Sequence, residues 1–231
     1  MIKTAILVDG AYYKKRMLKL RGAETPEEAA NTLYKYCQKH IKFGGKEECH
    51  LYRVLYYDCP PSMKKVYNPL TKTTVDLARE PLHDWNTAFL NELKSKRKFA
   101  LRLGALADEQ IAYSIKPETT KNLLSGAMSV DEVTMDDLAL SVRQKGVDIR
   151  IGIDIVSLAL RNQVEKIVLI AGDSDFVPAA KVARREGIDF VLDPIWATVK
   201  PELYEHVDGL KSFPCGLQDL SSGVWRRDEE L

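Results

Sequence analysis

The sequence predicts an α/β protein: a three-layer α/β/α sandwich with a mostly parallel central sheet. Two observations predict this fold. Short apolar, β-branched runs alternate with stretches of helical periodicity, and strands that alternate with helices form a parallel sheet covered on both faces. Several of the apolar runs end in an aspartate, as expected at the carboxyl edge of such a sheet. The 231 residues are enough for one large domain, placed at residues 1–214, with a C-terminal tail at 215–231.

The N-terminal part of the chain predicts the first two strands and two helices. Residues 2–8 form an apolar run that ends at Asp9, as a buried strand followed by a turn would. A helix is expected over residues 11–20, and a second over residues 27–41, where apolar side chains recur at helical spacing. Residues 50–57 are aromatic and β-branched, so they are expected to form the second strand.

The middle of the chain predicts a helix and a strand between two elaborations. Pro81 suits the first turn of a helix that runs to about residue 96, and residues 99–103 then form the third strand. Residues 59–72 contain prolines and show no periodicity, so we expect a surface loop. Residues 106–132 also lack a pattern, and we interpret them as a flexible insertion or a flap on the substrate side.

The rest of the chain returns to regular alternation. Helical periodicity predicts helices over residues 135–144, 151–161, 176–185 and 202–207. The apolar runs between and after the last three helices predict strands over residues 167–171, 188–192 and 210–213.

Composition excludes several classes of protein. A net charge of +1 gives no overall attraction to nucleic acid, so RNA binding would have to come from local basic groups. The N-terminus leads directly into a strand without the features of a signal peptide, and no apolar run is long enough to span a membrane, so we expect a cytoplasmic protein. The cysteines form no C-x-x-C pair and are expected to be reduced, packing residues: Cys37, Cys49, Cys59 and Cys215.

Four of the predicted strands end in an aspartate, and in a parallel sheet these ends share one edge. They are Asp9, Asp58, Asp173 and Asp193. We expect Asp9 and Asp173 to lie closest together, because the first strand and the strand after the long middle section are natural neighbours where the strand order reverses. Two plainer interpretations stay open: a solvent-facing strand end for Asp173 and an ordinary Asp-Gly turn for Asp9. Asp175 accompanies Asp173, and it also suits the N-cap of a helix beginning at Phe176.

Two further aspartates are candidates for the same site. Asp148 and Asp154 are six residues apart, so on one continuous helix they would lie about 240° from one another. Both can serve one site only if Asp148 precedes the helix. Asp154 lies between two isoleucines and therefore needs a partner, unless it belongs to an exposed polar face. For Asp148, too, a position on an exposed polar face is the alternative interpretation.

Several carboxylates around one pocket repel each other unless divalent cations neutralise them. Oxygen ligands of this kind suit Mg²⁺ or Mn²⁺ rather than zinc. Such ions can stabilise the charge of a phosphoryl displacement. The chain contains no G-x-x-x-x-G-K-[ST] phosphate loop, which argues against a nucleoside triphosphatase.

Three motifs together carry a resemblance to a known family. They are Val8-Asp9-Gly10, Lys145-Gly146-Val147-Asp148 with Asp154 six residues later, and Gly172-Asp173-Ser174-Asp175-Phe176-Val177-Pro178. With them the chain resembles the NYN domain of the PIN-like nuclease superfamily, in its LabA-like branch, from residue 2 to about residue 213. The resemblance implies a PIN-like, Rossmann-like topology and RNA cleavage that depends on a metal ion.

The resemblance also implies roles for individual residues. Asp9, Asp154 and Asp173 are implied as metal ligands, with Asp148 and Asp175 completing the catalytic cluster. Lys145 is implied to orient an acid or contact phosphate, and Ser174 within the last motif is placed with the substrate-binding residues. Tyr12 departs from the family pattern, which has Asn three positions after the first Asp. A phenol there either positions substrate or simply packs in the core.

A ribonuclease needs basic and aromatic groups on the substrate side. Lys64, Lys65 and exposed Tyr67 follow the second strand on the same edge as the acids, so we expect them to contact RNA, with solvated loop lysines as the alternative. The basic run at residues 94–98 falls on the opposite edge.

The sequence therefore predicts an Mg²⁺- or Mn²⁺-dependent ribonuclease. The alternative is a non-catalytic RNA- or protein-binding regulatory module that retains the acidic pocket. A third interpretation, a phosphatase that acts on small phosphate esters, is disfavoured because the sequence contains no recognisable nucleophile motif. The sequence leaves open whether the chain forms a homo-oligomer or binds a protein partner.

Overall fold

The computed structural model describes residues 1–43, 46–47 and 49–214. Its centre is a six-stranded sheet in the order β14-β13-β12-β1-β4-β7, and every neighbouring pair of strands is parallel. The strands are β1 (Ile2–Asp9), β4 (Cys49–Asp58), β7 (Phe99–Leu103), β12 (Lys166–Ile170), β13 (Asp189–Asp193) and β14 (Gly209–Leu210). The first five agree with predicted strands to within one residue at each end, whereas β14 overlaps the strand predicted over residues 210–213 only at Leu210. The strand order reverses beside β1, because the chain adds β4 and β7 on one side and β12, β13 and β14 on the other.

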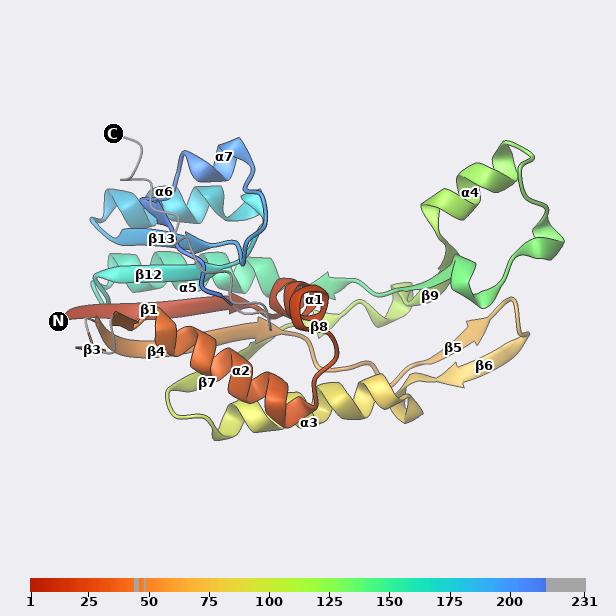
Figure 1. Ribbon diagram of the computed structural model, residues 1–231, viewed down its shortest axis with the longest axis horizontal. Coiled ribbons are helices and arrows are strands. Elements are labelled where there is room, and N and C mark those ends of the chain that lie inside the picture. The colour runs from red at the N-terminus through yellow and green to blue at the C-terminus, as the bar shows by residue number, and fades with distance from the viewer. Residues whose placement is uncertain (44–45, 48, 215–231) are drawn as a thin grey trace.

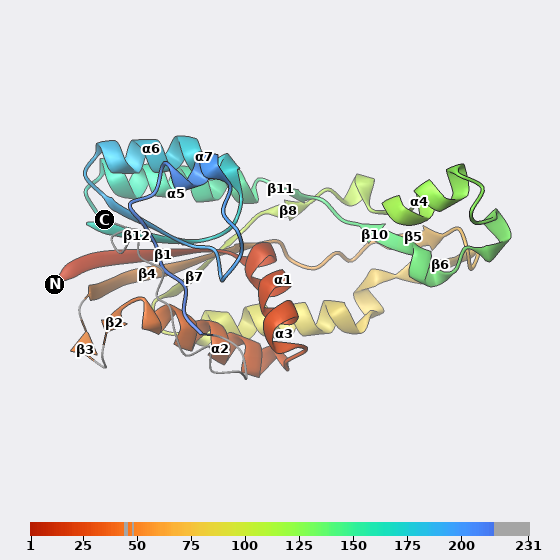
Figure 2. The same ribbon diagram turned by 45° about the horizontal axis from the view of Figure 1, so that its top comes forward.

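Helices cover both faces of the sheet (Figure 2). One layer holds α1 (Gly10–Arg21), α2 (Pro26–Lys39) and α3 (Pro81–Ser95), and the other holds α5 (Val147–Leu160), α6 (Val177–Arg185) and α7 (Pro201–Tyr204). Alternation along β1 serves the two layers: Leu7 packs with the second layer, whereas Ile6 and Val8 pack with the first. The expected three-layer α/β/α sandwich is therefore confirmed.

A long projection leaves the carboxyl edge of the sheet (Figures 1 and 2). We call residues 60–76 and 105–145 the arm. It contains two antiparallel pairs, β5 with β6 and β9 with β10, together with α4. Their bounds are Lys65–Asn68 for β5, Thr73–Asp76 for β6, Ala112–Ile115 for β9, Pro117–Leu124 for α4 and Leu138–Ser141 for β10. The short pair of β8 (Ala105–Leu106) and β11 (Gln144–Lys145) joins the arm to the sheet.

The arm is where the sequence-based predictions of structure are wrong. Residues 59–72 are not a plain loop, because β5 begins within them and forms a hairpin with β6. Residues 106–132 include β9 and α4 rather than a patternless flap. Residues 135–144 are not a helix: after a 3₁₀ turn, β10 pairs with β9, and this non-local pairing overrides the local helical pattern.

Smaller predictions have mixed outcomes. The cysteines that the structure describes, Cys37, Cys49 and Cys59, are free and buried, as expected, and Cys215 lies outside the described residues. The predicted tail at 215–231 and the Gly44-Gly45 break also lie outside them. A short strand pair, β2 (Lys42–Phe43) with β3 (Lys46–Glu47), was not predicted. Within the described ranges, no helix has the length and hydropathy needed to cross a bilayer.

Candidate functional site

The carboxyl ends of β1 and β12 carry the first two site residues. The two strands are direct neighbours, with Val8 opposite Ile170. Asp9 ends β1 and Asp173 follows the adjacent strand β12, at the point where the strand order reverses, so the predicted adjacency of the two strands is confirmed. The closest approach of the two carboxylates stays a prediction, because the charges that act on Asp9 come from Asp148 and Asp58. The Asp9 carboxylate also caps α1, because its Oδ1 accepts a hydrogen bond of 3.1 Å from the Tyr12 backbone N–H.

The turn after β12 is capped by Asp173, and the prediction that Asp175 is the cap is wrong. Oδ1 of Asp173 accepts a hydrogen bond of 3.3 Å from the Asp175 backbone N–H, at the start of a 3₁₀ turn over Ser174–Phe176. Because this turn precedes α6, the capping position moves two residues toward the N-terminus. The Asp175 side chain is exposed and is left without a capping role.

Asp148 enters the site from the first turn of α5. The helix begins at Val147, so Asp148 is part of the helix and does not precede it. Asp148 is exposed, but partial desolvation raises the pKa of its carboxyl, and the negative charges of Asp173 and Asp175 raise it further. The start of α5 thus lies close enough to the turn after β12 for these carboxylates to repel one another.

Asp9 belongs to the same electrostatic group. Burial raises the pKa of its carboxyl to about 6, against the lowering effect of its hydrogen bond from Tyr12, and the charges of Asp148 and Asp58 add to the rise. We call Asp9, Asp148, Asp173 and Asp175 the acid group. A buried carboxylate surrounded by like charges favours either a proton or a cation beside it.

Asp154 has partners of its own. Its Oδ2 accepts hydrogen bonds from the Tyr57 hydroxyl at 2.8 Å and from the Arg102 guanidinium at 3.2 Å. Among the described residues, the aspartates whose charges raise the pKa of Asp9 and Asp148 do not include Asp154. These contacts fasten α5 to β4 and β7, and the metal-ligand role expected for Asp154 stays a prediction. Asp148 and Asp154 share one continuous helix and face different directions.

Asp58 also follows a strand, but its charge is compensated. It is buried, and its Oδ2 lies 2.8 Å from Lys14 Nζ and accepts a hydrogen bond of 2.9 Å from the Tyr56 hydroxyl. Its other oxygen accepts a hydrogen bond of 3.0 Å from the side-chain amide of Gln144. Asp58 therefore fastens the base of the arm to α1.

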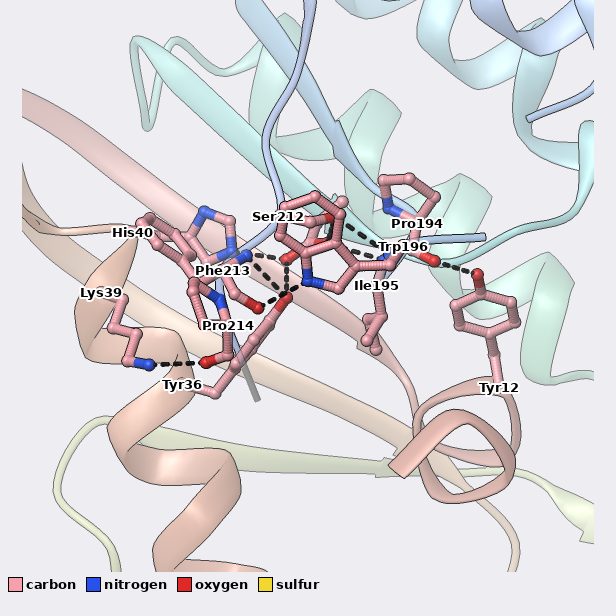
Figure 3. Close-up of polar contacts among 11 residues, drawn as sticks. Tyr12, Tyr36, Lys39, His40, Pro194, Ile195, Trp196, Ser212, Phe213 and Pro214 are labelled. Carbon is pink, nitrogen blue, oxygen red and sulfur yellow. Dashed lines mark hydrogen bonds and ion pairs between the residues drawn. The ribbon is translucent and has the colours of Figure 1, made fainter. Parts of the chain in front are cut away.

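Asp193, at the end of β13, is the most completely enclosed of the strand-end acids. Its Oδ2 accepts a hydrogen bond from the Tyr36 hydroxyl at 2.6 Å and lies 2.8 Å from Nε2 of His40. Oδ1 accepts hydrogen bonds from the Ser212 hydroxyl at 2.6 Å and the Ile195 backbone N–H at 2.8 Å. Figure 3 shows these partners converging from α2, the end of β13 and the segment after β14. This network is structural.

Tyr12 packs rather than points into open space. Its hydroxyl donates a hydrogen bond of 2.5 Å to the Pro194 carbonyl oxygen (Figure 3). Its ring lies against Gly172, where a Cβ atom would come within 2.4 Å of a ring carbon. Gly172 is required for this close approach. These contacts favour the packing interpretation of Tyr12, which ties α1 to the ends of β12 and β13.

The candidate RNA-binding residues of the arm differ in availability. The Lys64 ammonium donates hydrogen bonds to the backbone carbonyls of Asp108 and Ile111, so it holds the arm together. Lys65 and Tyr67 are both exposed on the same face of β5, and 58% of Tyr67 is accessible to solvent. Lys65 and Tyr67 are therefore available to a ligand.

Near the acid group, the structure adds a cation that sequence reasoning missed. The Lys200 ammonium donates a hydrogen bond of 3.4 Å to the hydroxyl of Ser174, and both residues lie next to the turn that Asp173 caps. Lys145, the predicted phosphate contact, is exposed and lies 3.9 Å from Glu109. The Lys200-Pro201 pair marks the start of a helix in the sequence, but nothing local places it beside Ser174.

The acid group fits a divalent cation by its chemistry. Its members are carboxylates, the oxygen ligands that Mg²⁺ and Mn²⁺ prefer, and burial and mutual repulsion raise the pKa of two of them. Among the described residues, no three His, Cys, Asp or Glu side chains are already arranged to hold an ion together. Binding would therefore require side-chain rotations that bring the carboxylates together.

Comparison with known proteins supports a family assignment. A family model described as "NYN domain" matches residues 74–203, which is more than half of the chain. The match includes Asp148, Asp173 and Asp175, whereas Asp9 lies before it. A crystal structure of a protein of unknown function from Vibrio parahaemolyticus is similar at 14% sequence identity and a TM-score of 0.47, over 94% of each chain. A search of curated proteins gave no match.

Proposed function

This chain belongs to the NYN domain family, and from that premise we propose that it is an Mg²⁺- or Mn²⁺-dependent ribonuclease that hydrolyses RNA phosphodiester bonds. One observation carries the proposal: the acid group gathers four carboxylates at one sheet edge, where Asp148 feels the charges of Asp173 and Asp175 and in turn acts on Asp9, whereas Asp58, Asp154 and Asp193 have compensating partners. Uncompensated negative charge at a ligand-binding edge is characteristic of a site that takes up a cation.

Within this proposal, Asp9, Asp148 and Asp173 hold the ion, and Asp175 adds negative charge at the rim. When bound, Mg²⁺ or Mn²⁺ supplies positive charge beside the scissile phosphate and promotes the deprotonation of water. Lys200 is placed to contact a phosphate near Ser174. These side chains come from the end of β1, the first turn of α5, the turn after β12 and the N-cap of α7.

We place the RNA along the arm. The arm leaves the same edge of the sheet that carries the acid group (Figure 1). An RNA strand bound along the arm would therefore lead to the acid group. Lys65 can contact a phosphate and Tyr67 can stack on a base, since both are exposed on one face of β5. This arrangement favours an extended, single-stranded substrate.

The test is an RNA cleavage assay with Mn²⁺ or Mg²⁺ on single-stranded and structured RNAs. Asp173→Asn should lower the cleavage rate at least ~100-fold, because a neutral amide is a poor ligand for a hard cation, while the free energy of unfolding changes little. Asp189→Asn is the matched control. Asp189 lies at the start of β13, on the opposite sheet edge, and pairs with Lys166 at 2.8 Å. Equal cleavage by wild type and Asp173→Asn would refute the proposal.

A second candidate function is a non-catalytic RNA-binding module. It is favoured by one observation: no three potential ligands among the described residues are already arranged around a common point. Binding of labelled RNA in EDTA and in Mn²⁺ separates the two functions. A binding module retains its affinity without metal and never cleaves, whereas the ribonuclease cleaves only when metal is added.

A further inference from the structure

The helix α5 carries an apolar face that its own chain leaves uncovered. Ile149, Ile153 and Leu160 are 68%, 58% and 57% exposed, and Val156 between them is only partly buried. The opposite side of the helix is the core face, with Val147, Ile151, Ile155, Leu158 and Ala159. A helix with two apolar faces is normally covered on both of them. The exposed stripe of α5 therefore lacks its partner among the described residues.

The spacing within this stripe is that of a helix–helix seam. Ile149, Ile153, Val156 and Leu160 follow one another at intervals of four, three and four residues. These intervals match the alternating d and a positions of a coiled coil, the positions at which one helix packs against another. The stripe is thus shaped for a second helix rather than for a small ligand.

A groove beside the stripe lets another helix approach closely. It has a volume of about 570 Å³ between α5 and α6, and Gly152 and Ala179 are among its lining residues. A Cβ atom on Gly152 would meet only the Ala179 Cβ, at the ordinary contact distance of 4.0 Å. The chain's own packing thus has room for a side chain, although glycine within a helix costs ~1 kcal/mol relative to alanine. A partner packed against this groove would explain the glycine.

We propose that this face binds a second copy of the chain through an antiparallel pairing of the two α5 helices about a two-fold axis. The observation that selects a second copy is that the stripe is complementary to itself. In an antiparallel pair, d positions face a positions. Centring the pair midway along the stripe sets Ile149 opposite Leu160 of the second copy, and Ile153 opposite its Val156. A two-fold interface requires this reciprocity.

Charge at the two ends of the helices favours the same arrangement. Asp148 and Asp175 lie at the N-terminal ends of α5 and α6, while Arg161 caps the C-terminal end of α5 and Arg185 lies in the last turn of α6. An antiparallel pair places the acidic end of each copy beside the basic end of the other. It also opposes the two helix dipoles. A parallel pair would bring like charges together.

The interface is tested by measuring the mass of the full chain in solution by sedimentation equilibrium over the micromolar range. The wild type should have twice the chain mass of 26.1 kDa. Ile153→Lys should be monomeric and still unfold cooperatively, because a lysine there is solvated in the monomer and buried in the dimer. Its melting temperature should not depend on protein concentration, whereas that of the wild type should rise with concentration. Leu124→Lys, on α4 of the arm and 84% exposed in the wild type, is the matched control and should remain dimeric. A monomeric wild type, or a dimeric Ile153→Lys, would overturn the proposal.

The antiparallel register has its own test by disulfide cross-linking in a Cys215→Ser background. Mixing Ile149→Cys with Leu160→Cys should give a covalent dimer on oxidation, since these positions face each other across the axis. Each variant alone should cross-link much more slowly. Rapid self-cross-linking of Ile149→Cys would contradict the antiparallel register, and no cross-linking of the mixture would contradict the interface.

Discussion

Two neighbouring strands of the sheet end in aspartates with opposite surroundings. At the end of β13, Asp193 is enclosed by Tyr36, His40, Ser212 and a backbone N–H. Beyond the end of β12, Asp173 is exposed, caps a turn, and lies near other carboxylates. A strand-end aspartate can therefore be either a structural anchor or a member of a site, and its partners decide which.

The comparison predicts the largest loss of stability at Asp193. Asp193→Ala should lower the free energy of unfolding by about 3 to 5 kcal/mol, because it leaves the buried Tyr36 hydroxyl, His40 and Ser212 without their acceptor. Urea denaturation measures the loss. Asp189→Asn, at the other end of the same strand, should lose less than ~1 kcal/mol because its pair with Lys166 is at the surface. Similar losses for the two variants would contradict the assignment.

Removing a charge from the acid group should change the free energy of unfolding in the opposite direction. Asp9→Asn should raise the free energy of unfolding at pH 7.5 by about 1 kcal/mol, since the amide can still cap α1 but carries no charge. The rise of the Asp9 pKa from 3.8 to about 6 in the folded protein sets an upper bound on this gain in stability, and solvent screening of the partly buried side chain makes the gain smaller.

This gain should depend on pH. Because the folded-state pKa is the higher one, the contribution of Asp9 to stability is fully present below pH 3.8 and is lost as pH rises through about 6. The advantage of Asp9→Asn should therefore shrink as pH falls from 7.5 to 4. Denaturation in EDTA at several pH values measures it. A destabilised variant at pH 7.5 would show that the Asp9 charge is compensated.

The smallest effect is expected at Asp154. Asp154→Asn should retain cleavage to within about 3-fold, because Asn can still accept the hydrogen bond from Tyr57 and the acid group is unchanged. The pair with half-exposed Arg102 contributes less than ~1 kcal/mol. The cleavage assay with Asp173→Asn as reference checks this. A loss as large as that of Asp173→Asn would return Asp154 to the site, as the sequence alone suggested.

The sequence predicted the sheet well because its strands are locally encoded. The strands β1, β12 and β13 are apolar runs that contain β-branched residues and alternate with helical patterns along the chain, so their burial in a parallel sheet follows from composition. The arm could not be predicted in the same way. The segment containing β10 has a helical pattern, and only β9, some 25 residues away in the sequence, supplies the backbone hydrogen bonds that make it a strand.

By itself, the sequence determined the fold class, the succession of strands along the chain and the edge on which the acids lie, because these depend on local pattern and on the rules for parallel sheets. Only the tertiary structure decided which acids are compensated. Lys14, Arg102 and His40 are far in sequence from the aspartates they contact, and their approach depends on how helices and strands pack. The same packing left one face of α5 uncovered. The sequence shows which residues of a helix are apolar, but only the tertiary structure shows which of them are buried.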